Sequence, residues 1–447
     1  MAMDPHERLT TEVVPSGDDR SDSRRDRDII LYTSAFKRLA GITQVTSADS
    51  GHVFHNRLTH TLQVAQVGRS LAEKLLKNRS ALAERLQIEP DVVESACLAH
   101  DLGHPPFGHV AEETLNRLMG EEAEGFEGNA QSFRIVSELA FRSPAYMGLN
   151  LTRATLRAIL KYPWTYQRRP KDKLNKWGAF QSEIESFKFC TGDANGGPVP
   201  RSVSSELMDW ADDLTYAVHD VEDFYRACLI PLHLLRPEPK QKDRGKGKGA
   251  ERERFLQYVW SRKEQIPELK GLSQDELDEI FADLIFAHFR IDCAYDGTRE
   301  HRARLRTFTS NLVNRYINGL SLAEANGKIV TLIDPGQRKE IAILKQLTWC
   351  YVIQAPGLAV QQHAQRQVIR CLFGVFKNEV GRHPSNLLPP YYKERLSNVV
   401  EKEGVGGLGS RRIVSDLIAG MTEAQAIALY QRLNGIVSGS ALDKILV

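Results

Sequence analysis

Apolar residues recur at helical spacing through most of this 447-residue chain, and this pattern limits its possible folds more than any other feature. Residues 58–76 carry one apolar stripe with a spacing of three to four residues, which predicts an amphipathic helix. A second helix is expected to begin at Pro90 and to end by Gly103, and a third to run from Ser204 through Tyr225. Strand signals are few. We therefore predict an all-α fold.

Changes in composition divide the chain into four parts. Residues 1–27 are polar and charged, and we expect a mobile N-terminal arm. Residues 28–235 form the expected helical core, and residues 236–254 are so poor in apolar side chains that a flexible charged insertion is expected. Residues 255–447 should form a C-terminal helical region packed on the core. Within the core, residues 163–201 are rich in Gly, Pro, Lys and aromatic side chains, which indicates a long loop. Helices are expected in the C-terminal region at 255–288, 300–322, 338–352, 358–378 and 412–434.

Charge and cysteine usage exclude several classes of protein. Lys and Arg number 59 against 57 Asp and Glu, so the chain lacks the basic excess of a dedicated duplex-DNA binder. Six cysteines without a CxxC pair indicate buried thiols in a reducing cytosol. The N-terminus has no apolar signal sequence, and no apolar run reaches 18 residues. We expect a cytoplasmic protein without a membrane span.

The densest polar signal lies at the end of the second predicted helix. His100, Asp101, His104 and His109 fall within ten residues, although the whole chain has only 13 histidines. Adjacent His and Asp side chains cannot share one face of a straight helix, but both can reach one ion at a frayed C-terminal turn. A lone His-Asp pair is more often a surface pair or a satisfied core histidine, so further ligands are needed.

Candidate partners lie upstream and downstream of this cluster. His60 stands near the start of the first predicted helix, and Asp212 and Asp213 stand in the third helix among apolar residues. A buried carboxylate requires a cation or hydrogen-bond donors. Taken singly, His60 is as readily structural as functional, and Asp212 could simply pair with an arginine. Two histidines and two carboxylates suit Mn, Fe, Co, Ni or Mg, whereas a Cys-rich structural zinc site is excluded by the spacing.

The order of these residues resembles the HD superfamily of phosphohydrolases. The surrounding sequence is similar to that of one branch of this superfamily, the deoxynucleotide triphosphohydrolases typified by dGTPase. The matching sequence segments occur in the same order as in the family. The match is close over residues 25–225 and looser over the C-terminal half. They are RDRDIILYTSAFKRLAGITQV, NRLTHTLQVAQVGRSLA, AHDLGHPPFGHVAEE, FEGNAQSFRI, ILKYPW, ELMDWADDLTYAVHDVED and LIAGMTE.

This resemblance implies a metal site and a sugar site. The implied metal ligands are His60, His100, Asp101 and Asp212. Asp212, Tyr216 and Asp220 follow one another at intervals of four, so they share one helical face, while Asp213 points about 100° away. The resemblance implies that Tyr216 packs on a deoxyribose and that Asp220 and Gln44 bind its 3′-hydroxyl. Without the motif, Tyr216 would equally well be an ordinary core tyrosine.

The resemblance also implies a set of phosphate-binding residues. Arg57 matches a family arginine that binds phosphate, and His104 and Lys161 are candidates for the rest of a triphosphate. A triphosphate carries about four negative charges, so several cations are required. Lys176 is a weaker candidate, because six other Lys or Arg residues surround it in the same loop.

One histidine is set apart as a candidate catalytic group. His109 and Glu112 lie three residues apart, a spacing that lets the carboxylate orient the imidazole. Asn129, in the FEGNAQ phrase, either bridges this pair to substrate or is structural.

These residues together predict hydrolysis at the α-phosphorus of a dNTP, releasing a deoxynucleoside and inorganic triphosphate. One divalent metal is expected, Mn or Mg first, with Fe, Co or Ni open. The alternatives are another HD-type nucleotidase or phosphodiesterase, and a non-catalytic regulator that binds nucleic acid through residues 236–254. Family members are commonly homo-oligomers, and some are activated by a nucleotide effector. An effector site could be lined by Arg302, Arg304, Arg306 and Arg315, although a solvated basic helix is the simpler interpretation.

Overall fold

The computed structural model confirms an all-α architecture. It describes residues 3–12, 16–44, 55–78, 81–193, 195–236, 248–289, 293–325, 327–382 and 386–440. In this part of the chain the only sheet is an antiparallel pair, β1 (Leu320–Ala325) with β2 (Lys328–Ile333). Among the same residues no helix combines the length and the apolar character needed to cross a bilayer.

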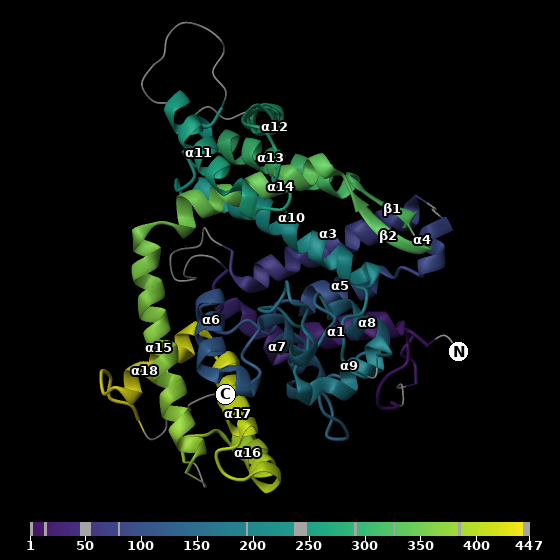
Figure 1. Ribbon diagram of the computed structural model, residues 1–447, viewed down its shortest axis with the longest axis vertical. Helices are drawn as coiled ribbons and strands as arrows, with labels where there is room; N and C mark the ends of the chain where they lie inside the picture. The colour runs from purple at the N-terminus through teal and green to yellow at the C-terminus, as the bar shows by residue number, and fades with distance from the viewer. Residues whose placement is uncertain are drawn as a thin grey trace, which may run out of the picture.

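Three helices form the centre of the larger core. α3 (Arg57–Lys77), α5 (Pro90–Ala99) and α10 (Val203–Arg226) pack on one another, and α1 (Asp22–Tyr32) and α8 (Arg153–Ile159) pack on α5 (Figure 1). The Asn56 side chain caps α3 by accepting the Thr59 N–H. α10 begins at Val203, one residue before the expected start at Ser204, and is capped by the Ser202 side chain. Ser205 instead donates its hydroxyl to the Leu160 carbonyl.

The remaining helices surround this centre and extend it toward the C-terminus. They are α2 (Ser34–Arg38), α4 (Ala81–Leu86), α6 (His109–Met119), α7 (Gly128–Arg134), α9 (Ile184–Thr191), α11 (Lys248–Arg262), α12 (Gln274–His288), α13 (Arg299–Asn318), α14 (Pro335–Thr348), α15 (Pro356–Val380), α16 (Pro390–Glu403), α17 (Leu408–Ala419) and α18 (Glu423–Leu433).

Two predicted helices are each two helices in the structure. The expected helix 255–288 is divided into α11 and α12, because a capping box at Ser273 and Glu276 starts a new helix. The expected helix 412–434 is divided in the same way, since α17 ends at Gly420 and a capping box at Thr422 begins α18.

The N-terminal segment, for which a mobile arm was predicted, contacts the core. Arg8 donates to the Asp26 carboxylate and to the Asn150 carbonyl, both at 2.7 Å. Ser21 caps α1, which therefore crosses the expected boundary at residue 27. The charged side chains of this segment thus have partners within the same chain. Of the insertion expected at 236–254, the residues from Lys248 on belong to α11, and residues 237–247 lie outside the described residues.

A second core joins the C-terminal helices to α6. The long helix α15, at the left of Figure 1, passes from the upper part of the molecule to the lower part. Its buried residues begin only at Val368, and from there it packs with α17 and α6. α6 begins with His109, so the C-terminal region contacts the helix that carries a predicted catalytic residue.

Candidate active site

The packing of α3, α5 and α10 brings three predicted metal ligands together. His60 lies on α3, His100 follows α5, and Asp212 lies on α10. Asp212 Oδ1 is 3.2 Å from His60 Nε2 and 3.6 Å from His100 Nε2. The donor atoms of the three side chains all lie within 4.8 Å of one another, a spacing that suits shared coordination of one ion.

His100 supplies the clearest indication that a cation belongs in this cluster. Its Nδ1 lies 2.6 Å from the Cys97 carbonyl oxygen, which can only accept, so Nδ1 carries a proton and Nε2 is the ring nitrogen that could bind an ion in place of its own proton. Nε2 is buried and has no hydrogen-bond partner among the described residues. A buried polar atom left without a partner is rare and calls for an unseen ion or water.

The electrostatics of the cluster favour the same conclusion. Burial lowers the pKa of His100, but the Asp101 and Asp212 carboxylates outweigh burial and raise the pKa to about 9. The two carboxylates therefore favour a positive charge at this position, and a divalent cation would supply it.

Asp101, the fourth predicted ligand, lies beside the cluster but has other partners. Its Oδ2 accepts a hydrogen bond from Arg57 Nη1 at 2.6 Å. Its Oδ1 is 3.0 Å from His104 Nδ1 and 3.4 Å from His100 Nε2. Burial raises the pKa of Asp101, but Arg57 and His100 bring it well below its ordinary value, so the carboxylate is ionised. Arg57 and His104 thus hold a carboxylate that faces His100.

The neighbouring aspartate points elsewhere. Asp213 accepts a hydrogen bond from Lys345 of α14 at 2.6 Å, as the helical spacing from Asp212 requires. Lys161, predicted to bind phosphate, lies 2.7 Å from Asp209 Oδ1 and 3.5 Å from Asp212 Oδ2. Its ammonium group is therefore at the edge of the metal cluster.

The residues predicted to bind the sugar include two buried atoms without partners. Asp220 Oδ2 and Gln44 Oε1 have no hydrogen-bond partner among the described residues. Burial, with the charges of Asp223 and Asp212, raises the pKa of Asp220 well above its ordinary value. Burial and the charges of Asp220 and Asp212 likewise raise the pKa of Tyr216, so its phenol shares this acidic environment. A neutral hydroxyl is a fitting partner for such groups.

The predicted catalytic pair forms at the start of α6. His109 Nδ1 lies 2.7 Å from Glu112 Oε2; the histidine side chain is 75% exposed and the glutamate is buried. Glu112 Oε1 accepts the Gly128 N–H at 3.1 Å and lies 3.5 Å from Lys176 Nζ. The ring of His109 meets the ring of His104 edge-on at 5.1 Å between centroids. His104 thus connects the catalytic pair with the Asp101 carboxylate.

Two residues near the His109–Glu112 pair were not assigned to it from the sequence: Glu127 was not identified, and Lys176 was only a weak candidate for binding phosphate. Lys176 Nζ lies 2.9 Å from Glu127 Oε1 and so belongs to the catalytic pair's surroundings rather than to a solvated loop. Glu127, at the N-cap of α7, also accepts the Asn129 side-chain amide at 2.8 Å. Asn129 therefore touches the His109–Glu112 pair only through Glu127 and Lys176. A Glu directly before a Gly-Asn helix start was the available signal for this N-cap.

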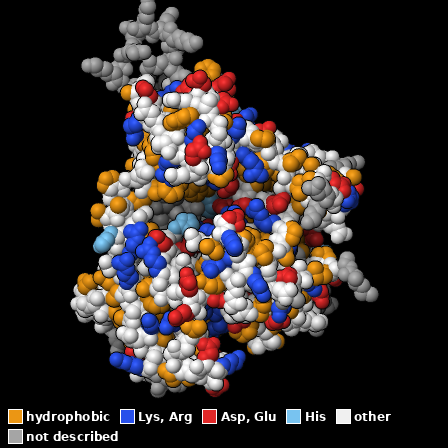
Figure 2. Space-filling model, in the orientation of Figure 1, with side chains coloured by type: hydrophobic (Ala, Val, Ile, Leu, Met, Phe, Trp, Pro, Cys, Tyr) orange, Lys and Arg blue, Asp and Glu red, His pale blue; other side chains and the backbone are white. Residues whose placement is uncertain are grey.

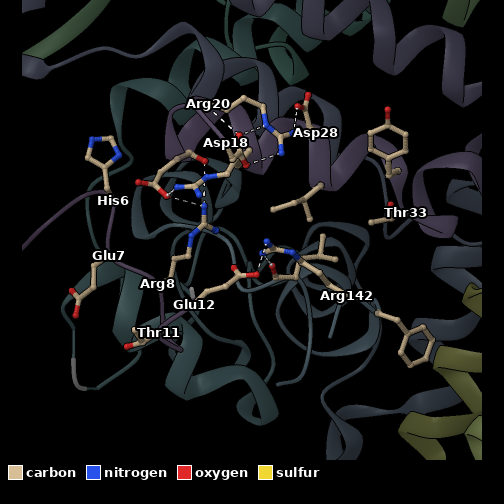
Figure 3. A pocket seen from close by; sticks show the side chains of 16 residues that line it. His6, Glu7, Arg8, Thr11, Glu12, Asp18, Arg20, Asp28, Thr33 and Arg142 are labelled. Carbon is tan, nitrogen blue, oxygen red and sulfur yellow. Dashed lines mark hydrogen bonds and ion pairs between the residues drawn. The ribbon is translucent and has the colours of Figure 1, made fainter. Parts of the chain in front are cut away.

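The surface over the site is hollowed. Figure 2 shows a recess between the upper and lower parts of the molecule in which histidine side chains are exposed, bordered by basic side chains. A separate cavity beneath α1 has a volume of about 640 Å³ (Figure 3). Its arginines pair with acidic side chains that line the same cavity: Arg20 pairs with Asp18 and Asp28, and Arg142 with Glu12.

The basic helix α13 carries the four arginines considered for an effector site. Arg304 pairs with Glu300, and Arg315 pairs with Glu340 through two hydrogen bonds. Arg302 and Arg306 are exposed. This arrangement favours a solvated basic face.

Comparison with known proteins agrees with this geometry. A family model described as "HD domain" matches residues 57–216, and one described as "Phosphohydrolase-associated domain" matches residues 332–432. A Streptomyces coelicolor protein named deoxyguanosinetriphosphate triphosphohydrolase-like protein is 34% identical, with 93% of each chain covered. Proteins of the same name from Shewanella sediminis and Corynebacterium efficiens are 30% and 32% identical, and the alignments cover 98% and 93% of this chain, and 98% and 92% of the respective relatives.

Proposed function

Because the chain belongs to the deoxyguanosinetriphosphate triphosphohydrolase-like family of HD-domain hydrolases, we propose that it hydrolyses deoxynucleoside triphosphates to deoxynucleoside and inorganic triphosphate. The observation that carries this proposal is the cluster of His60, His100 and Asp212 with its orphaned nitrogen, set beside the His109–Glu112 pair. A metal cluster next to an oriented histidine is suited to hydrolysis of a phosphate ester.

Four side chains would hold the divalent cation, Mn or Mg first, with Fe, Co or Ni compatible with the same donors. They are His60, His100, Asp101 and Asp212. When bound, such a cation would offset charge on the phosphate oxygens and lower the pKa of a water molecule.

His109 would act on the reacting phosphate. Glu112 would accept a hydrogen bond from the Nδ1–H of His109. Nε2 then remains available to act at the α-phosphorus or to protonate the leaving 5′-oxygen. The imidazole is largely exposed, which leaves it accessible to a substrate in the recess. Lys176 and the Gly128 N–H, both on the other Glu112 oxygen, keep that carboxylate in place.

The triphosphate would be bound by Arg57, His104 and Lys161. Arg57 Nε is buried without a hydrogen-bond partner in the described part of the chain, so it retains a donor for a phosphate oxygen. Burial and the adjacent Arg57 lower the pKa of His104 to about 4. At neutral pH His104 would therefore serve as a neutral hydrogen-bonding group, and Arg57 and Lys161 would supply the positive charge.

The deoxyribose would lie against α10. Tyr216 would pack on the sugar face that lacks a 2′-hydroxyl, and Asp220 and Gln44 would bind the 3′-hydroxyl with the two oxygens that have no partner. A hydroxyl that meets an acceptor is favoured over one buried without a partner by about 1–3 kcal/mol. The substrate class thus follows from the groups that the free protein leaves unsatisfied.

The direct test is product analysis. Each of the four dNTPs, alone and in mixtures, is incubated with the protein and Mn or Mg, and the products are separated by anion-exchange chromatography beside matched rNTP reactions. Triphosphate and deoxynucleoside support the proposal. Orthophosphate or a monophosphate product would indicate another HD-type phosphohydrolase. No product with any nucleotide, in protein shown to hold metal, would favour a non-catalytic role.

A further inference from the structure

A carboxylate from the far end of the chain reaches the two segments that deliver site residues. Glu423 is the first residue of α18 and is buried. Its Oε1 accepts the Thr43 N–H at 2.7 Å and the Phe107 N–H at 3.1 Å, and its Oε2 accepts the Thr43 hydroxyl at 2.7 Å. Thr43 precedes Gln44, and Phe107 lies two residues before His109. One side chain therefore links the sugar-binding segment to the catalytic loop.

The catalytic loop needs such support because its backbone is strained. Phe107 has φ +70°, a left-handed conformation that a residue with a large side chain rarely adopts. Gly108 follows with φ +57°, and a Cβ there would lie 3.2 Å from Arg57 Nη2. A conformation of this kind is unfavourable and persists only where the surroundings impose it. The Glu423 carboxylate on the Phe107 N–H is one of those constraints.

The sugar-binding segment is held on its other side by α3. Thr43 forms an antiparallel bridge with Asn56, and the Arg57 N–H donates to the Ile42 carbonyl at 3.0 Å. Gln44 is therefore placed between the start of α3 and the start of α18. Without Glu423, the segment would lose three hydrogen bonds that hold it to the start of α18 and to Phe107.

Arg38 connects the same C-terminal segment to the loop after the metal ligands. Its Nη2 donates to the Leu102 and His104 carbonyls at 2.7 and 2.9 Å, and its Nη1 donates to the Met421 carbonyl at 3.1 Å. Met421 and Glu423 thus lie next to the loop that runs from His100 and Asp101 to His109. The segment at the start of α18 therefore contacts both the loop after the metal ligands and the segment of Gln44.

We propose that Glu423 is a positioning residue for the hydrolytic site: it fixes the Gln44 segment and the His109 loop relative to each other, although it touches neither the substrate nor the metal. This inference rests on the proposed function for its kinetic consequences. Its structural content, a coupling of residues 42–44 to residues 105–109 through α18, is independent of the substrate.

The kinetic test compares two substitutions at this position. Glu423→Ala removes all three hydrogen bonds and should lower kcat by about 10- to 100-fold with metal content unchanged, as loss of an orienting partner does. It should also reduce the preference for dNTPs over dideoxynucleotides. Glu423→Gln should restore both, since its amide oxygen can accept both N–H groups and its NH₂ can donate to the Thr43 hydroxyl.

Asp26 provides a matched control. Its Oδ2 accepts the Thr152 N–H at 2.9 Å and the Thr152 hydroxyl at 2.7 Å, so this carboxylate, like Glu423, binds both the N–H and the hydroxyl of one threonine, and it lies outside the metal cluster. Asp26→Ala should lower thermal stability with kcat close to wild type. Equal losses of kcat in the Asp26 and Glu423 variants would reduce Glu423 to a general stability role and overturn the proposal.

Two further measurements keep the proposal testable if Glu423→Ala does not fold or if wild type hydrolyses no dNTP. Thr43→Val removes one hydrogen bond on the sugar side and should raise KM more than it lowers kcat; an unchanged KM contradicts the proposal. The second measurement is the rate of amide hydrogen exchange in residues 38–44 and 102–112. It is made on metal-loaded Glu423→Gln and Thr43→Val, and on Glu423→Ala where that variant folds. Glu423→Ala, or Thr43→Val in its absence, should speed exchange in both segments. Acceleration confined to α18 overturns the coupling whatever the activity is.

Discussion

Two polar regions of this molecule are built in opposite ways. The cavity beneath α1 has a volume of about 640 Å³, and its charged side chains have partners: Arg8 binds Asp26, Arg20 binds Asp18 and Asp28, and Arg142 binds Glu12. The metal cluster is more deeply buried, yet in the part of the chain that the structure describes His100 Nε2 and Asp220 Oδ2 have no hydrogen-bond partner, whereas in the cavity lining this holds only for Arg25 Nε.

This difference teaches where to look for function in such a fold. Polarity does not distinguish the two regions, since both are rich in charge. The two regions differ in whether their polar atoms have partners. Ion pairs that neutralise each other leave few groups to bind a ligand, whereas buried polar atoms without partners lower stability unless a ligand forms hydrogen bonds with them. Four predictions follow the two regions from the largest expected effect to the smallest.

The largest effect is expected at the ligand shared by both histidines. Asp212→Asn should lose metal and turnover together, by about 10³-fold or more in kcat, because the cation's charge and its phosphate contact are lost at once. Mn should raise the melting temperature of wild type and leave that of the variant unchanged, since only the folded state with an intact site binds it. Asp18→Asn in the cavity should keep both properties. A metal-loaded, active Asp212→Asn protein would refute the site.

The next effect separates chemistry from metal binding. His109→Ala should lose about 10² to 10⁴ in kcat while its metal content stays at the wild-type level. Glu112→Gln should lose less, because it leaves the imidazole present but less firmly oriented. Metal content and single-turnover rates measure the two quantities. An empty metal site in His109→Ala would instead make His109 a ligand.

Much of this site could be predicted from the sequence. His60, His100 and Asp212 belong to apolar helical patterns, and the family resemblance together with the helical period separated Asp212 from Asp213, which the structure directs to Lys345. The all-α fold followed from the same periodicity. Local patterns of this kind are encoded within one or two helical turns.

What the sequence did not reveal depends on contacts between distant segments. Glu423 accepts backbone N–H groups of two distant segments and Glu127 pairs with Lys176 of the long loop, and the sequence carries no spacing rule that would join Glu423 to Thr43. The N-terminal segment was expected to be mobile because its charges were judged one at a time, whereas Arg8 is held by Asp26 and Asn150. Tertiary pairing of charges leaves no local signature.

A smaller effect should reveal sugar selection. Tyr216→Ala should narrow the preference for dNTPs over rNTPs about tenfold, because a 2′-hydroxyl would no longer meet the ring. Asp220→Ala should narrow the preference for dNTPs over dideoxynucleotides by a similar factor. Both ratios come from kcat/KM for paired substrates. Wild type that hydrolyses rNTPs and dNTPs equally well would remove the deoxynucleotide from the proposal while leaving the metal site intact.

The smallest effect concerns stability, and the two regions should give opposite signs. Burial raises the pKa of Asp220, so ionising it destabilises the folded protein as pH rises above the carboxyl's unfolded value. The hydrogen bond with Arg20 lowers the pKa of Asp18 to about 2, so its ionised form stabilises the fold at neutral pH and this contribution is lost as pH falls from about 4 to about 2.

In metal-free protein at pH 7, Asp220→Asn should therefore raise the melting temperature by roughly 2 °C, and Asp18→Asn should lower it by no more than that, because exposed ion pairs contribute little. Below about pH 4 both differences should shrink, since Asp220 is then protonated in the folded and unfolded states alike and Asp18 is losing its charge. Thermal unfolding across this pH range measures both. If Asp220→Asn is destabilising at pH 7, the carboxylate already has a partner in the free protein, and the contrast between an unsatisfied site and a satisfied cavity fails at its sugar end.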